Sequence, residues 1–199
     1  MKSIASFIFI CCFISAVAQT DTIKLNFLYG SKPAKDHRQS ESKVFGGLKG
    51  GHVNIEANGK VLDFMPGDCP LFPKNKNPTG GFRINNDVYW NTTEDKWTTI
   101  LIPVTPAQMN HLDSLFNLYQ RSTPFDYAVF GMRCASASYY VLSKIGLFER
   151  ISDRKNVTIH FYPKLLRKRM VRWAAKNHYP IIEHEGKSTR KWEKDKGLF

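Results

Sequence analysis

Residues 51–64 have the sequence GHVNIEANGKVLDF and predict a β-hairpin with a definite register. Asn58-Gly59 lies between two runs of alternating apolar and polar residues, and Asn-Gly in this setting is the strongest short-range signal for a hairpin. With these two residues in the turn, Asn54 lies opposite Asp63. Side chains alternate between the faces of a strand, so one face is apolar and is expected to join the core. That face consists of Val53, Ile55, Leu62 and Phe64.

The polar face of this hairpin brings His52 close to Asp63. The two residues are diagonal neighbours across the strands, with backbones about 7–8 Å apart and side-chain ends closer than that. A carboxylate in this position can fix the tautomer of the imidazole and raise its basicity, as the third member of a nucleophile, base and orienter set does. The alternative is an ordinary hairpin whose polar face is half exposed, and the hairpin by itself leaves this alternative open.

Cys134 is the candidate nucleophile, because it begins a helix that the sequence predicts over residues 134–145. The first turn of a helix has free N–H groups and partial positive charge, which lower the pKa of a thiol. The backbone N–H of Cys134 can also donate to an oxyanion. Two alternatives remain open. Cys134 is a buried structural cysteine, or it forms a disulfide with Cys69, for which the sequence shows no chemical role.

The other segments predict an α+β fold, in which a small antiparallel sheet packs on helices. Thr105 is a good N-cap, Pro106 fits the first position of a helix, and Gln108 completes a capping box. Apolar patterning predicts a strand over 23–29, a buried strand over 98–104 and a helix over 163–177. The prolines and the Gly80-Gly81 pair of residues 66–87 predict a long, irregular surface stretch.

A secretory signal peptide is predicted over residues 1–18. An apolar run over residues 4–17 follows a short basic start, and residues 16–18 (AVA) form a small-residue cleavage site. The alternative is a membrane anchor. We therefore expect an exported protein, in the periplasm or outside the cell, with one domain over residues 19–184 and a charged tail over residues 185–199.

The amino-acid composition indicates which kinds of partner the protein is expected to bind. The chain has 29 Lys and Arg residues against 17 Asp and Glu residues, a formal net charge of +12. An exported protein meets few nucleic acids, so we expect no nucleic-acid partner, and an anionic surface of the cell envelope is the candidate partner for this charge. The helix over 163–177 carries a run of cations, although a solvated amphipathic face is the alternative. The six histidines show no metal-ligand spacing, so we expect no metal and no cofactor.

The hairpin and the cysteine helix together resemble the circularly permuted NlpC/P60 papain-like proteins, which include the YiiX-like and lecithin:retinol acyltransferase-like groups. The resemblance covers residues 23–147 and rests on the order His52, Asp63, Cys134. It implies a permuted papain-like fold and thiol chemistry on amides or esters, with Cys134 as nucleophile, His52 as general base and Asp63 as orienter. The acyltransferase-like group usually has histidine as the third member and asparagine before the cysteine, where this chain has Asp63 and Arg133.

Two functions are therefore expected. The first is an exported cysteine hydrolase of the amidase, thiol protease or esterase type, or an acyltransferase, which acts through a thioester. Its candidate substrates are cell-wall peptides, other amides and lipid esters. The second is a non-catalytic envelope-binding module that uses the basic helix and tail, with Cys134 in a structural role. The sequence leaves the substrate, the oligomeric state and the role of Cys69 open.

Overall fold

The computed structural model describes residues 21–29, 51–68, 70–74, 80–88, 90 and 95–186. The predicted signal peptide, Cys69 and residues 187–199 of the predicted tail lie outside these ranges. The elements in chain order are β1 (Asp21–Tyr29), β2 (Gly51–Ala57), β3 (Lys60–Met65), β4 (Gly81–Asn85), β5 (Trp97–Val104), α1 (Pro106–Arg121), α2 (Cys134–Lys144), α3 (Asp153–Ile159), α4 (Pro163–Lys176) and β6 (Ile181–His184).

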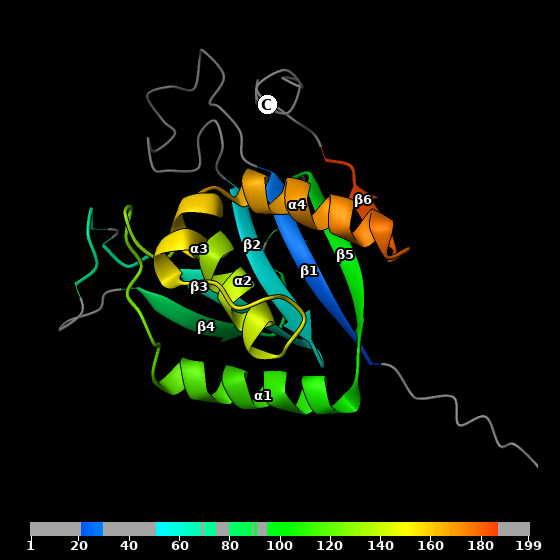
Figure 1. Cartoon of the computed structure of the whole chain (residues 1–199), viewed down its shortest axis with the longest axis horizontal. Coiled ribbons are helices and arrows are strands. Elements are labelled where there is room, and N and C mark those ends of the chain that lie inside the picture. The colour runs from blue at the N-terminus through cyan, green and yellow to red at the C-terminus, as the bar shows by residue number, and fades with distance from the viewer. Residues whose placement is uncertain are drawn as a thin grey trace, which may run out of the picture.

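The described strands form one six-stranded antiparallel sheet with the order β4-β3-β2-β1-β5-β6. The helices lie on one side of this sheet, with α1 and α4 at its two ends and α2 and α3 between them (Figure 1). The predicted α+β class, with an antiparallel sheet packed on helices, is confirmed.

The predicted hairpin register is also confirmed. Asn54 pairs with Asp63 and Ala57 with Lys60. The turn residue Asn58 has a φ of 49°, in the left-handed region that the first position of a type I′ turn requires. The Asn-Gly turn, which the local sequence specifies, therefore positions β2 and β3, the two strands that carry His52 and Asp63.

The main core lies between the sheet and the helices. The capping box of α1 is formed as predicted, with the backbone N–H of Gln108 donating to the side chain of Thr105. The apolar face of the hairpin is buried in this core, together with the predicted face of α1. The buried residues of α1 are Met109, Leu112, Leu115, Phe116 and Tyr119.

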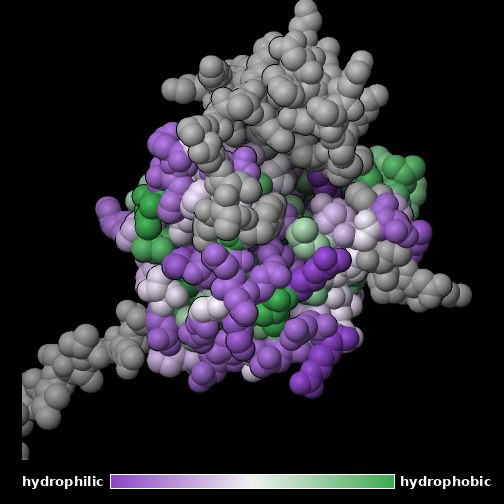
Figure 2. Space-filling view, turned by 180° about the vertical axis from the view of Figure 1, so that it is seen from behind, coloured by the Kyte–Doolittle hydropathy of each residue, from purple (hydrophilic) through white to green (hydrophobic). Residues whose placement is uncertain are grey.

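The opposite face of the hairpin is also buried near the site. His52, Asn54 and Asp63 are all buried, so this part of the polar face is not half exposed. Val88 and Trp90 form a small second cluster there with Val61, and the Trp90 ring packs against the His52 ring. Figure 2 shows the back of the molecule, where hydrophilic side chains predominate around smaller apolar areas.

Three short elements were not predicted from the sequence. The stretch 66–87, which was expected to be irregular throughout, contains β4, and α3 and β6 are further additions. Both strands lie at edges of the sheet, where β4 pairs with β3 and β6 pairs with β5. Such short strands depend on a partner strand for their stability, and local periodicity does not reveal that partner.

Candidate active site

His52 and Asp63 form a buried hydrogen-bonded pair on adjacent strands. Nε2 of His52 lies 2.8 Å from Oδ1 of Asp63. The other carboxylate oxygen, Oδ2, accepts a hydrogen bond from Nδ2 of Asn85 at 2.7 Å. The two oxygens of Asp63 are thus held from both sides, by a residue of β2 and by the last residue of β4.

Cys134 is the first residue of α2 and carries a free, buried thiol. Its hydrogen-bond partners are the His52 side chain and the backbone of Val53. Because Nε2 of His52 is hydrogen-bonded to Asp63, the hydrogen bond between His52 and the thiol involves the other ring nitrogen, Nδ1. The structure therefore brings together all three residues that the sequence singled out, in the linear order Cys134, His52, Asp63.

The electrostatics of this set favour an ion pair. Burial alone would lower the pKa of His52, but the Cys134 charge and the hydrogen bond to Asp63 raise that pKa to about 10. Burial alone would raise the pKa of Cys134, but the charge and hydrogen bond of His52 lower it. The guanidinium of Arg133 and the backbone N–H of Val53 lower the Cys134 pKa further. The directions of both shifts favour an imidazolium beside a thiolate over the neutral pair.

Asp63 holds the negative charge that balances this imidazolium. Burial by itself would raise the pKa of Asp63, but the hydrogen bond and charge of His52 lower it, and the Asn85 amide adds to that effect. The carboxylate is therefore ionised and accepts hydrogen bonds from both neighbours. A buried charge with two good hydrogen-bond partners is well satisfied.

The start of α2 is fixed by its own capping interactions. The backbone N–H of Arg133 donates to Oγ of Ser136 at 2.9 Å, and Oγ of Ser136 donates back to the carbonyl of Arg133 at 3.1 Å. The Arg133 side chain is buried, with its guanidinium carbon 4.4 Å from the ring centre of Phe161 and 5.3 Å from that of Tyr162. These contacts hold the residue before the thiol and place a cation beside it.

A second network ties α2 to α3 and α4. Asn156 donates from Nδ2 to the carbonyl of Ser136 at 2.9 Å. Arg169 can only donate, so its 2.9 Å contact makes Nε2 of His160 an acceptor. Nδ1 of His160 then carries the proton and donates to Oδ1 of Asn156 at 2.7 Å. The network positions the first turn of the cysteine helix through neutral His160.

Sequence reasoning missed several residues of the site. Asn85 and Trp90 come from a stretch with no strong periodicity, and Trp90 lies edge-on to the His52 ring with centroids 5.7 Å apart. His160 is the buried C-cap residue of α3. The i, i+4 spacing of Asn156 and His160 on a short helix is the signal that could have linked them.

Tyr29 and the arginines of the basic helix make contacts elsewhere in the fold. The Tyr29 hydroxyl is 3.2 Å from Oε2 of Glu183 and accepts from Thr98 at 3.1 Å, so it takes part in a network on β5 and β6. The Arg167 guanidinium stacks on the Tyr29 ring at 3.3 Å. Arg167 therefore has a structural contact, as Arg169 has with His160, whereas Arg172 is exposed on α4.

The described part of the chain also bears on metal binding and on membrane insertion. Within it, no three His, Cys, Asp or Glu side chains are grouped so that they could hold a metal ion. None of its helices is both long enough and apolar enough to span a membrane. Comparisons of the chain with family models, curated proteins and solved structures find no match. The geometry around Cys134 therefore carries the functional proposal.

Proposed function

We propose that the protein is a cysteine hydrolase that cleaves an amide or ester by acyl transfer, with Cys134 as nucleophile, His52 as acid and base, and Asp63 as orienter. The single observation that carries this proposal is the buried set Cys134, His52 and Asp63, in which the imidazole bridges a thiol and a carboxylate. A structural cysteine has no need of a histidine whose second nitrogen is held by a buried carboxylate.

The first half of the reaction forms a thioester. The Cys134 thiolate attacks the carbonyl carbon, a C–S bond forms, and the carbonyl electron pair moves to oxygen. The imidazolium of His52 then gives its proton to the leaving nitrogen or oxygen as the bond to carbon breaks. The backbone N–H at the start of α2 is available to donate to the oxyanion.

The second half releases the acyl group. Neutral His52 takes a proton from water, and the resulting hydroxide attacks the thioester carbon. The C–S bond breaks, the carboxylic acid leaves and the thiolate is restored beside an imidazolium. Asp63 stays ionised throughout, because its role is to hold the ring and to balance its charge.

The arrangement also supports a permuted papain-like fold as part of the proposal. The histidine strand and the orienter strand precede the cysteine helix in the chain, and β2 and β3 are neighbours in an antiparallel sheet. We further propose that the protein acts after export, on a substrate of the cell envelope. The predicted signal peptide supports that location, and amides of the cell wall and esters of lipids remain the two substrate classes.

The acyl-enzyme itself tests this function. Incubation with p-nitrophenyl acetate should add one acetyl group to Cys134, detectable by mass spectrometry of the intact protein and removable with hydroxylamine. Cys134→Ser should abolish the adduct and the turnover. A matched control is Ser138→Ala, which alters a nearby buried residue of the same helix that takes no part in the proposed chemistry. Acetylation elsewhere, or turnover that survives in Cys134→Ser, would overturn the proposal.

A further inference from the structure

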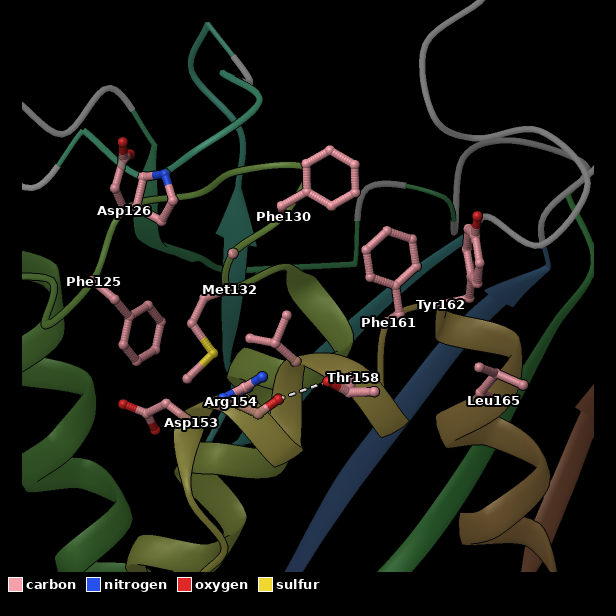
Figure 3. Close-up of a pocket in the computed structure, with 13 residues that line it drawn as sticks. Phe125, Asp126, Phe130, Met132, Asp153, Arg154, Thr158, Phe161, Tyr162 and Leu165 are labelled. Carbon is pink, nitrogen blue, oxygen red and sulfur yellow. Dashed lines mark hydrogen bonds between the residues drawn. The ribbon is translucent and has the colours of Figure 1, made fainter.

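A large cavity lies beside the start of α2. Its volume is about 830 Å³, and the loop before α2, helix α3 and the start of α4 line it. In the view of Figure 3, Phe125 and Met132 lie along one side of the cavity and Phe161 and Leu165 along the other. Such a volume lies in the upper part of the range for small-molecule sites and exceeds what one amino-acid side chain needs.

Two of the polar side chains that line the cavity, those of Asp126 and Thr158, are committed to the protein itself, whereas the charged side chains of Asp153 and Arg154 are exposed on α3. Both carboxylate oxygens of Asp126 accept backbone hydrogen bonds, from Lys74 at 2.8 Å and from Gly80 at 3.2 Å. The Thr158 hydroxyl donates to the carbonyl of Arg154 at 2.8 Å, the contact dashed in Figure 3. A polar ligand would have to compete with these bonds, so the lining favours an apolar one.

The cavity lies next to the candidate active site, and the polypeptide chain and side-chain packing connect the two. Met132 lines it and is two residues from Cys134, a span of at most about 7 Å of extended chain. Phe161 and Tyr162 line it too, and both rings contact the guanidinium of Arg133. Cys134 itself does not line the cavity, so a ligand there would reach the thiol with one end only.

One part of the rim of the cavity is apolar. Phe130 lines it and is 57% exposed, and its ring lies 5.5 Å from that of Phe72, which is 66% exposed. The two segments are held together, since the N–H of Phe130 donates to the carbonyl of Leu71 at 2.8 Å. Gly131 allows this approach, because a Cβ there would lie 2.8 Å from Cγ of Pro73. The exposed rings are therefore held in place.

We propose that this cavity binds the unbranched aliphatic chain of an amphiphilic ester or amide, with the scissile carbonyl directed toward Cys134. The inference rests on the proposed hydrolase function and narrows its substrate class. An aliphatic chain suits a cavity lined mainly by apolar side chains, in which Asp126 and Thr158 are already hydrogen-bonded to the protein. The exposed Phe72 and Phe130 extend the apolar surface from the cavity to solvent, which gives the chain a route of entry.

A chain-length series tests the proposal on the full protein. The probes are p-nitrophenyl acetate, butyrate, octanoate and decanoate, kept below their aggregation limits. Each added methylene buried in the cavity should raise kcat/KM about fourfold until the cavity is filled, which corresponds to about 0.8 kcal/mol per CH₂. Turnover that stays flat or falls as the chain lengthens would overturn the proposal.

Two variants locate the effect. Val157→Arg places a charge in the cavity and should remove the preference for decanoate over acetate. Leu118→Arg is the matched control, because Leu118 is an exposed apolar residue of α1 outside the cavity, and this variant should keep the preference. Equal loss in both variants would contradict the assignment. If Val157→Arg fails to fold, Phe130→Ser at the exposed mouth makes the same comparison.

Binding without turnover separates this inference from the function on which it rests. Cys134→Ser should bind a fluorescent fatty acid, and decanoate should displace it. If the aliphatic chain binds but no turnover depends on Cys134, the proposed hydrolase function is overturned and the cavity assignment stands. If Cys134 turns over the acetate ester but no aliphatic chain binds, the cavity assignment is overturned and the hydrolase function stands. Decanoyl ester presented in anionic vesicles, compared with monomers, then identifies a bilayer or a soluble amphiphile as the source of the chain.

Discussion

Nε2 of His52 lies 2.8 Å from Oδ1 of Asp63, and neither residue has more than a small part of its surface exposed. The pair bridges two strands of a hairpin whose register is set by an Asn-Gly turn. Because Asp63 binds one ring nitrogen, the other faces Cys134. One cross-strand contact therefore determines the direction in which the candidate base points.

Asp63→Asn keeps the shape of the side chain and removes its charge. The pKa of His52 should fall, because one of the groups that raise it is lost. Turnover should drop by about 10²–10⁴, the range expected when an orienting carboxylate is neutralised. The measurement is kcat for an activated ester, with Asp68→Asn as a control at an exposed carboxylate. An unchanged kcat in Asp63→Asn would show that the pair does not serve catalysis.

Phe64→Ala tests how the hairpin is anchored. The Phe64 ring packs against Phe82, Phe125 and Tyr127, with centroids 4.9, 5.3 and 5.3 Å away. Loss of this buried ring should lower the free energy of unfolding by about 3–5 kcal/mol. Urea unfolding measures the change, and Phe72→Ala at an exposed ring should cost far less. Similar losses in both variants would mean that Phe64 is not part of a packed core.

His160 should make the fold sensitive to acid. Burial and the neighbouring Arg169 lower the pKa of His160 to about 4, against about 6.5 in the unfolded chain. Between these values the unfolded chain binds more protons, so stability is full above about pH 6.5 and falls as the pH drops toward 4. His160→Gln should show a weaker fall in the free energy of unfolding over this window. Parallel pH curves for the two proteins would contradict this account.

The predictable part of this structure came from local signals. The register around Asn58-Gly59 and the capping box at Thr105 are set by neighbouring residues, so the sequence predicted them correctly. The juxtaposition of His52, Asp63 and Cys134 followed from a hairpin face and a helix start. The burial of His52 did not follow, because Trp90, which packs against its ring, comes from a segment without periodicity.

The remaining parts of the site depend on tertiary contacts that a single sequence does not display. Asn85 reaches Asp63 only because β4 pairs with β3, and β4 is a short edge strand. The cavity forms between α3, the loop before α2 and α4, so its lining comes from separate segments. A single sequence motif therefore predicts neither the Asn85 contact nor the cavity lining.

The cations of α4 bear on the proposed envelope partner. Arg172 and Lys176 are exposed, and no acidic residue lies on that helix. Vesicles with anionic lipid should bind the protein, and binding should weaken steeply with salt because screening shortens to about 3 Å at 1 M. Arg172→Glu with Lys176→Glu should lower the affinity at least about tenfold, since each basic residue near such a surface contributes about 1 kcal/mol.

The same number of charge reversals on other elements provides the control for α4. Arg83→Glu with Arg121→Glu changes the net charge by the same amount at exposed positions of β4 and α1. A smaller effect there would assign the binding to α4. Equal effects from both pairs would assign it to net charge, and binding that ignores salt and both pairs would leave α4 as a solvated helix face.

The pH dependence of Cys134 alkylation tests the central claim most directly. An ordinary cysteine with a pKa near 8.5 loses roughly 200-fold in thiolate between pH 9 and pH 6. The lowered pKa of Cys134 predicts that its rate with iodoacetamide changes far less over this range, whatever its absolute value in a buried site. His52→Phe should restore the ordinary steep profile. A steep profile in the natural protein, or no difference between the two proteins, would contradict the thiolate–imidazolium pair.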